Sequence, residues 1–373
     1  MDSPVPVLLL GLSPGPGGTE LQMVGIAEHL DRSRFDPHVC VFRAGWTTPE
    51  ELGSFNFHVL HLPVRSFRSA SALGFARDLY RYIRRHGIAL THSWDSPTNL
   101  FSIPIARAAR VRAVLTSQRC HRSLTRPPYG RILRLTDRLA DGIVVNSRFL
   151  VDHLLHDEKT PAAKIHRCIN GVDIDTYTAA AGQKRPPILQ NAGLVVGVVC
   201  LLRPVKNLPL LLRAFAKVRG LRPRLKLLMV GDGPVRDSLI ALRQELGLDD
   251  SECIFEPVTR DVPFWLRAID IFVLPSFSEG LSNSLIQAMV MGRCVMASAI
   301  EGNLELIEHG RTGLLFRSDD VDSLAAELKL VIEDDGLRLR LGENASVFSR
   351  REFSWENAAR SMEHIYSQAL REH

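Results

Sequence analysis

The chain has 373 residues, of which 45% are hydrophobic and 23% charged, and its net charge is +5. This length predicts two domains, and the composition excludes disordered and fibrous proteins. No apolar run reaches the roughly 18–20 residues of a bilayer-spanning helix. The segment from Met1 to Gly15 lacks the basic start of a signal peptide, so a first buried strand is predicted there. The six cysteines are widely spaced without a CxxC pair, which argues against disulfides and zinc and favours a reducing cytosol.

Positive charge is concentrated in the first half of the chain. The segment from Arg65 to Arg148 contains sixteen arginines, no lysine and four acidic residues, a net charge of +12. Two interpretations stay open: a basic surface that receives an anionic partner, or arginines distributed over solvated helix faces.

Short apolar runs alternate with amphipathic segments, which is typical of βαβ units and a parallel sheet. In the first half, strands are predicted at 5–12, 38–43, 88–92, 113–116 and 142–146, and helices at 19–30, 72–86 and 99–109. In the second half, strands are predicted at 194–201, 225–230, near 254 and at 271–275, and helices at 208–218, 235–246, from about 282 and at 355–370. The stretch 179–193 has no periodicity and is predicted to be a linker. We therefore predict two doubly wound α/β domains, at 1–180 and 190–352.

Two glycine-rich turns allow either a structural or a ligand-binding interpretation. The turn at 14–20 has no Gly-Lys-Ser/Thr, and Glu20 stands where a dinucleotide fingerprint has its third glycine. It is either an anion-binding loop before a helix or only a tight turn. The turn from Gly231 to Pro234 is interpreted as structural, the alternative being a ligand contact at the carboxyl end of a strand.

A third turn leads from a strand into a helix and favours phosphate binding. A positively polarised cradle would form from the backbone amides of Gly280, Leu281, Ser282 and Asn283. Glu279 beside this cradle would repel a phosphate and is expected to accept hydrogen bonds from sugar hydroxyls. The alternative is that Ser282 or Asn283 only caps the helix.

Two other strand ends carry residues suited to a cleft. Arg203 and Lys206 follow the first strand of the second half, where they would either clamp a diphosphate or be merely solvated. His92 ends a strand of the first half, where cleft residues gather, although a lone histidine is more often structural. Neither HExxH nor another ligand spacing is present, so no metal site is predicted.

Together these motifs resemble the retaining glycosyltransferases of the GT-B fold, the glycosyltransferase-4 group, over nearly the whole chain. The matching segments are 17–20 (GGTE), 170–173 (NGVD), 203–207 (RPVKN), 230–234 (VGDGP), 270–280 (DIFVLPSFSEG) and 309–315 (HGRTGLL). The resemblance implies two Rossmann-like domains facing across a cleft, with the terminal helix at 355–373 packed back on the first domain. It also implies a nucleotide-diphospho-sugar donor of UDP or GDP type, bound without a metal or other cofactor.

The resemblance further implies roles for single residues. Lys206, with Arg203, would hold the diphosphate and stabilise the charge that develops on it, while Glu279 would hold the donor sugar. His92 and Arg119 would lie near the reaction. The other donor contacts would come from Gly17, Gly18, Gly231, Val258, Gly280, Leu281, Ser282, Asn283 and Gln287.

Three residues depart from the family pattern. Gln287 stands where the family has the Glu that takes the ribose hydroxyls, which should weaken donor binding without removing it. Leu201 stands where many members of the family have an Arg. Arg203, in the adjacent loop, would take over the role of that Arg. Gln118 stands where some relatives have a catalytic His, and Arg119 beside it is expected near the cleft.

We therefore predict an enzyme, a retaining hexosyltransferase that uses a nucleotide-sugar and a glycan or lipid-linked acceptor in cell-surface polysaccharide synthesis. The arginine-rich first domain favours an anionic acceptor or an anionic bilayer surface. We expect a cytoplasmic protein with peripheral contact at the inner face of the plasma membrane, and no nucleic-acid partner. The alternative, motivated by Gln287 and Leu201, is a degenerate GT-B protein that binds a nucleotide-sugar or scaffolds a partner without turnover.

Overall fold

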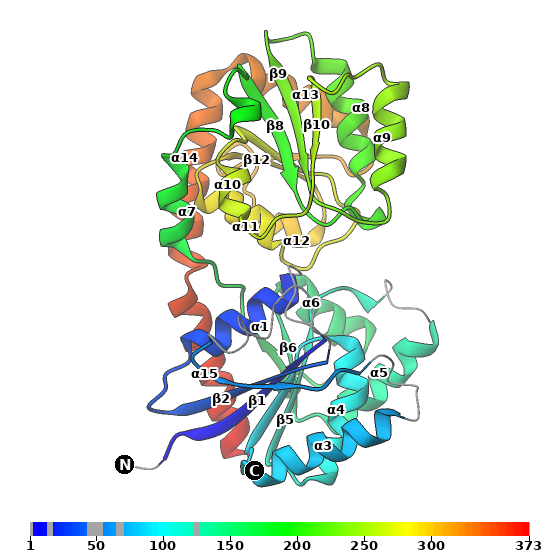
Figure 1. Ribbon diagram of the computed structural model, residues 1–373, viewed down its shortest axis with the longest axis vertical. Helices are drawn as coiled ribbons and strands as arrows, with labels where there is room; N and C mark the ends of the chain where they lie inside the picture. Colours follow the sequence, from blue (N-terminus) through cyan, green and yellow to red (C-terminus); the bar gives the residue numbers. More distant parts are fainter. Residues whose placement is uncertain (1–2, 13–17, 43–54, 65–70, 123–126, 373) are drawn as a thin grey trace. The chain divides into compact units, whose positions relative to one another are not determined.

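The structure is a computed structural model that describes residues 3–12, 18–42, 55–64, 71–122 and 127–372. The chain divides into two compact units. The first unit contains Met1–Gly171 and Trp355–His373, and the second contains Val172–Ser354. Each unit is built on its own parallel β-sheet (Figure 1).

The described part of the first unit has seven parallel strands in the order β3-β2-β1-β4-β5-β6-β7. The strands are β1 (Val5–Gly11), β2 (Phe35–Val41), β3 (His58–His61), β4 (Leu90–Ser93), β5 (Ala113–Gln118), β6 (Gly142–Val145) and β7 (Ile165–Arg167). The helices are α1 (Gly18–His29), α3 (Ser71–Arg85), α4 (Ser96–Ala108), α5 (Pro127–Leu139), α6 (Arg148–Asp152) and α15 (Trp355–Arg371). Helix α4 begins three residues before its predicted start because Asp95 caps it, accepting a hydrogen bond from the Thr98 amide at 2.9 Å.

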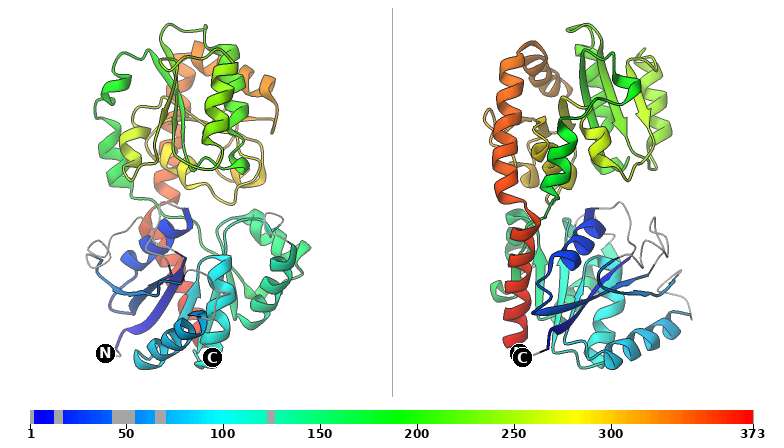
Figure 2. Two further views of the ribbon diagram at one scale, coloured as in Figure 1. Left: turned by 45° about the vertical axis from the view of Figure 1, so that its right-hand side comes forward. Right: turned by 60° about the vertical axis from the view of Figure 1, so that its left-hand side comes forward.

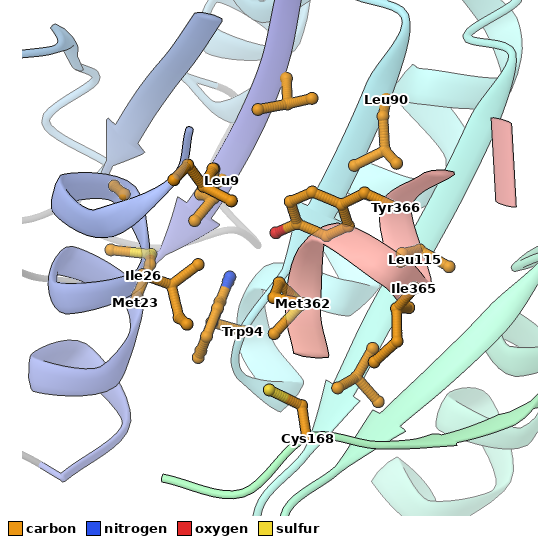
Figure 3. Packing of buried hydrophobic residues seen from close by; sticks show 14 of the residues in the cluster. Leu9, Met23, Ile26, Leu90, Trp94, Leu115, Cys168, Met362, Ile365 and Tyr366 are labelled. Carbon is orange, nitrogen blue, oxygen red and sulfur yellow. The ribbon is translucent and has the colours of Figure 1, made fainter. Parts of the chain in front are cut away.

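Strand β1 supplies the centre of the first unit's core. Its side chains alternate between the two faces of the sheet, as the geometry of a strand requires. Val7 and Leu9 belong to the cluster that includes α1 and α15, whereas Leu8 and Leu10 belong to the cluster that includes α3 and α4. Figure 3 shows the first cluster, with Tyr366 of α15 beside Leu9.

Helix α15 is an integral part of the first unit, and it lies along that unit's sheet (Figure 2). Its first residue, Trp355, is 8% exposed and stacks on His29 at 5.3 Å between ring centroids. Gly25 and Gly171 make room for this ring, because a Cβ atom at either position would lie within 2.2 Å of it. Further along the helix, Glu363 accepts hydrogen bonds from the Asp31 amide and from the guanidinium of Arg34.

The described part of the second unit has six parallel strands in the order β10-β9-β8-β11-β12-β13. The strands are β8 (Leu194–Val199), β9 (Leu225–Val230), β10 (Cys253–Glu256), β11 (Ile271–Leu274), β12 (Cys294–Ser298) and β13 (Leu314–Phe316). The helices are α7 (Ile174–Ala181), α8 (Leu208–Val218), α9 (Arg236–Glu245), α10 (Val262–Leu266), α11 (Asn283–Val290), α12 (Glu301–Leu304), α13 (Val321–Glu333) and α14 (Asp335–Glu352). Within the described ranges, no helix of either unit combines the length and apolar character needed to cross a bilayer.

The structure divides the chain between Gly171 and Val172, before the boundary predicted at 180–190. Asp173 caps α7 by accepting a hydrogen bond from the Thr176 amide, and α7 packs on α10 and α11 of the second unit. The irregular stretch after α7 also belongs to this unit, because Arg185 makes two hydrogen bonds of 2.6 Å to the Asp270 carboxylate. Leu189 in this stretch is buried as well.

Candidate active site of the second unit

The chain order of the second sheet reverses between β8 and β11. Doubly wound sheets bind their ligands at such a point, beyond the carboxyl ends of the strands. The loop after β8 carries Lys206 and the loop after β11 carries Glu279. A backbone hydrogen bond of 2.8 Å from Phe277 to Val205 joins the two loops.

Lys206 and Glu279 form an ion pair at this point. The Lys206 Nζ donates to Glu279 Oε1 at 2.6 Å, and the side chains are 17% and 12% exposed. Burial alone would lower the pKa of Lys206, but the charges of Glu279 and Cys200 and the hydrogen bond to Glu279 together outweigh it and raise this pKa above its ordinary value of 10.5. Lys206 is therefore charged at neutral pH, and its ammonium has three N–H donors, of which this hydrogen bond uses one.

The loop after β8 presents Lys206 at the end of a 3-10 turn, Pro204–Lys206. The next residue, Asn207, adopts the left-handed conformation with φ of 46° and donates a hydrogen bond to Asp319 at 3.2 Å. Helix α8 then begins at Leu208. Arg203 lies exposed before the turn and Leu201 is half-buried, so Arg203 is placed near Lys206 in the chain but not inside the ion pair.

Sequence analysis missed the residues that support Glu279. The Ser276 hydroxyl, fully buried, donates to Glu279 Oε1 at 2.6 Å. The Ser276 carbonyl in turn accepts from Ser298 of β12 at 2.6 Å, and Asn303 of α12 donates to the Ser298 carbonyl at 3.0 Å. Ser276 and Ser298 belong to no recognisable motif, and Asn303 lies more than twenty positions after Glu279. The sequence near Glu279 therefore does not indicate them.

Gly302 is the one supporting residue with a sequence signal, a glycine inside a short helix. A Cβ atom there would lie 2.0 Å from the Gly280 carbonyl oxygen and 2.5 Å from that of Glu279. Only glycine therefore allows α12 to approach the turn that carries the predicted phosphate cradle.

The predicted cradle lies at the start of α11. Gly280, Leu281 and Ser282 are buried and Asn283 is half-buried. Ser282 occupies the N-cap position, yet its side chain makes no capping hydrogen bond, and its hydroxyl lies 3.3 Å from that of Ser284. Side-chain capping by Ser282 therefore does not account for this turn, and phosphate binding here stays a prediction.

The remaining donor residues of this unit lie at neighbouring positions. Gly231, with φ of 149°, lies against the loop after β8, where a Cβ atom would be 1.9 Å from the Cys200 carbonyl oxygen. This close approach supports the structural interpretation of the turn after β9. Val258 is half-buried after β10, and Gln287 is 6% exposed on α11. Their contacts with a donor remain predictions.

The structure argues against a catalytic role for His92, which lies in the core of the first unit. Its side chain has no exposed surface, and its two ring nitrogens bond to the hydroxyls of Tyr366 at 2.9 Å and Ser117 at 2.8 Å. Burial, followed by the charges of Arg119 and His166, lowers its pKa well below 6.5. A neutral histidine with both nitrogens engaged by core side chains is structural.

Arg119, in contrast, lies at a pocket of the first unit. Its guanidinium stacks 4.4 Å from the ring centroid of Trp94 and donates to Asn170 at 3.2 Å, while burial lowers its pKa to about 10. The pocket lies after β4 and β5 and is lined by Ser96, Asn99, Ser117, Gln118, Arg119, Cys120, Arg122, Leu133 and Asp137.

Of the two glycines predicted to contact the donor from the first unit, Gly18 is the first residue of α1, and Gly17 lies outside the described residues.

Comparisons with known proteins agree with this architecture. Two families match the chain: Glycosyltransferase Family 4 over residues 16–176 and Glycosyl transferases group 1 over residues 184–348. The D-inositol 3-phosphate glycosyltransferase of Corynebacterium efficiens is 28% identical over 81% of this chain and 76% of its own length. That of Xylanimonas cellulosilytica is 24% identical over 93% and 81%.

Solved structures show the same fold over whole chains. The Anabaena protein Alr3699/HepE, in complex with UDP and glucose, matches with a TM-score of 0.85 at 22% identity, covering 98% of this chain and 100% of its own. Sucrose-phosphate synthase from Thermosynechococcus elongatus matches with a TM-score of 0.82 at 19% identity, covering 99% and 100%.

Two Rossmann-like α/β units, each built on its own parallel sheet, make this a protein of the GT-B fold. The chain belongs to the group 1 glycosyltransferases of this fold and is a glycosyltransferase.

Proposed function

We propose that this glycosyltransferase uses a nucleotide-diphospho-sugar of UDP or GDP type, bound at the Lys206–Glu279 pair of the second unit. The carrying observation is the 2.6 Å ion pair at the strand reversal, which places a charged ammonium beside a carboxylate. Two N–H donors of Lys206 would bind the diphosphate, and Glu279 would accept hydrogen bonds from the sugar hydroxyls. The Alr3699/HepE protein binds UDP and UDP-glucose, which supports this donor class.

The proposed reaction is transfer with retention, without a resident cofactor. The acceptor hydroxyl attacks the anomeric carbon from the face that the diphosphate leaves, the carbon–oxygen bond to phosphate breaks, and the hydroxyl proton passes to the departing phosphate oxygen. Such a reaction needs positioning and positive charge at the leaving group. Lys206 would supply that charge, together with Arg203 and the amides at the start of α11.

For the acceptor we propose an anionic glycan or lipid-linked molecule bound at the Arg119 pocket of the first unit. The pocket is lined mostly by polar side chains and contains Arg119 and Arg122. Arg122 is already paired with Asp137 and Glu158, so Arg119 is the cation expected to meet the acceptor. The curated relatives are named for a phosphorylated acceptor, D-inositol 3-phosphate, which favours an anion here as well. The product would serve cell-surface polysaccharide synthesis.

The surface of helix α5 supports a proposed contact with an anionic membrane, at its cytoplasmic face. Its exposed apolar residues, Ile132, Leu135 and Leu139, follow the spacing of one helix face and are 48%, 57% and 41% exposed. Exposed arginines at 131, 134 and 138 flank them. This combination is typical of helices that lie at the surface of an anionic membrane.

Product analysis tests the transfer, and vesicle binding tests the membrane contact. In a mixture of candidate donors and phosphorylated acceptors, NMR of the product should show the donor's anomeric configuration retained; an inverted product would contradict the mechanism. Donor binding without any product across such acceptors would instead favour the degenerate, non-catalytic alternative. For the membrane, Leu135→Glu should reduce cosedimentation with anionic vesicles, and Leu339→Glu, an exposed leucine of α14, is the matched control.

A further inference from the structure

Four side chains with metal-binding atoms gather at one edge of the first unit's sheet. Asp36 and His38 lie on β2, His58 lies on the edge strand β3, and His86 directly follows α3. The sheet register pairs His38 with His58. The proposed reaction uses none of these residues, so this histidine cluster needs an explanation of its own.

The distances within the cluster match those of ligands that share one ion. His38 Nε2 lies 3.2 Å from Asp36 Oδ2, and His58 Nε2 lies 3.9 Å from Asp36 Oδ1. In a tetrahedral zinc site, with bonds of about 2.0–2.1 Å, neighbouring ligand atoms are about 3.3 Å apart. Asp36, His38 and His58 each have one ligand atom that lies within 4.8 Å of the ligand atoms of the other two.

The exposed imidazole of His86 lies beside this set but outside the group of three, so it would have to turn toward a bound ion to complete the site. Its ring centroid is 5.3 Å from that of His38 and 6.4 Å from that of His58, and the His38 and His58 centroids are 4.5 Å apart. Imidazoles that bind one zinc through a ring nitrogen have centroids about 5 Å apart, given zinc–nitrogen bonds near 2 Å. Three imidazoles and one carboxylate are a ligand set that suits Zn²⁺.

We propose that Asp36, His38, His58 and His86 form a Zn²⁺ site that ties the edge strand β3 to β2 and to the end of α3. The site is separate from the proposed reaction, since its four ligands include no residue of the Lys206–Glu279 pair or of the lining of the Arg119 pocket. Its role is structural, because four protein ligands leave no open position for a substrate.

Tyr82 provides the second layer of this site. Its hydroxyl lies 2.7 Å from His38 Nδ1, and His38 is 2% exposed, so the ring is held in one orientation. Without zinc, His38 Nε2 carries the proton that it donates to Asp36. When zinc binds Nε2, that proton moves to Nδ1, which donates to the Tyr82 oxygen. Such an outer hydrogen bond orients a ligating histidine in many metal sites.

A second group, His121, His153 and Asp157, also contains possible metal ligands in the first unit. It is less suited to a cation because Glu158, next to Asp157, pairs with both Arg122 and Arg134. A test for zinc must therefore distinguish the two groups.

Zinc titration of the full chain, freed of any histidine tag, tests the proposal. Calorimetry with ZnCl₂ should show one site whose affinity falls at least about tenfold in His58→Gln and in His86→Gln. Both residues are exposed, so these variants should fold, and circular dichroism checks this. The matched control is His61→Gln, because His61 is also exposed on β3 but outside the cluster; its affinity should equal that of the wild type.

Two further measurements make the result decisive. Tyr82→Phe should weaken zinc binding about 10–100-fold by removing the outer hydrogen bond. Co²⁺ in place of zinc should give the visible spectrum of a four-coordinate ion, which His58→Gln should abolish. Zinc affinity unchanged in His58→Gln and His86→Gln would overturn the proposal, as would zinc binding that is lost only in His153→Gln.

Discussion

Removing the Lys206 ammonium tests the second unit's site most informatively. In Lys206→Ala, Glu279 keeps its bond to Ser276 but loses its cation while only 12% exposed. Breaking a fully buried pair in this way costs about 3–5 kcal/mol. Because both side chains retain some contact with solvent, we expect roughly 1–3 kcal/mol less stability here. Loss of the positive charge at the leaving group should lower kcat by about 10²–10³-fold.

The double variant Lys206→Ala/Glu279→Gln separates stability from catalysis. Removing the unpaired carboxylate should recover most of the lost free energy of unfolding, whereas activity should stay low. Urea unfolding gives the stability, and release of nucleoside diphosphate from the donor gives the rate. Lys217→Ala is the matched control, because Lys217 is 52% exposed on α8 and pairs with Asp322 at the surface. A single variant that loses stability yet turns over at the wild-type rate would refute the role of Lys206.

Three other substitutions test the roles of Gln287, Gly302 and His92. Gln287→Glu should raise donor affinity in calorimetry if this position binds the ribose, and an unchanged affinity would count against that role. Gly302→Ala should cost about 1–3 kcal/mol in urea unfolding, because its Cβ would lie 2.0 Å from the Gly280 oxygen; a neutral effect would show that α12 does not support the turn. His92 has a pKa well below 6.5 in the fold, so on acidification the unfolded chain binds the proton first. Stability should therefore fall as the pH drops below about 6.5, by at most about 1.4 kcal/mol per pH unit from this group. His92→Gln should make that slope shallower, and an identical slope would contradict the buried, neutral assignment.

Apolar periodicity predicted the elements that carry the core. Helix α8 and strand β9 have the predicted bounds, because seven of the eleven residues of α8 are buried and β9 is an almost continuous buried run. The stretch around α7 could not be predicted in this way. Its position depends on a cap by Asp173 and on the Arg185–Asp270 pair, which joins residues 85 positions apart.

Candidate site residues were predictable where they lie in the loops that follow strands. Lys206 and Glu279 each follow a strand at the reversal of the sheet, and the structure brings them together. The same reasoning misplaced His92, since a strand-end histidine can as well be turned into the core, where Tyr366 from the far end of the chain meets it. The histidine cluster has no linear spacing, because β2, β3 and the end of α3 contribute its members separately.

Calorimetry of the full chain with UDP-, GDP- and ADP-sugars measures whether the Lys206–Glu279 pair holds a nucleotide-sugar. We expect a UDP- or GDP-sugar to bind to the wild type and Lys206→Ala to weaken this binding greatly, while Lys217→Ala leaves it unchanged. Absence of binding by every one of these donors, or equal binding by Lys206→Ala, would contradict the claim that the Lys206–Glu279 pair holds a nucleotide-sugar.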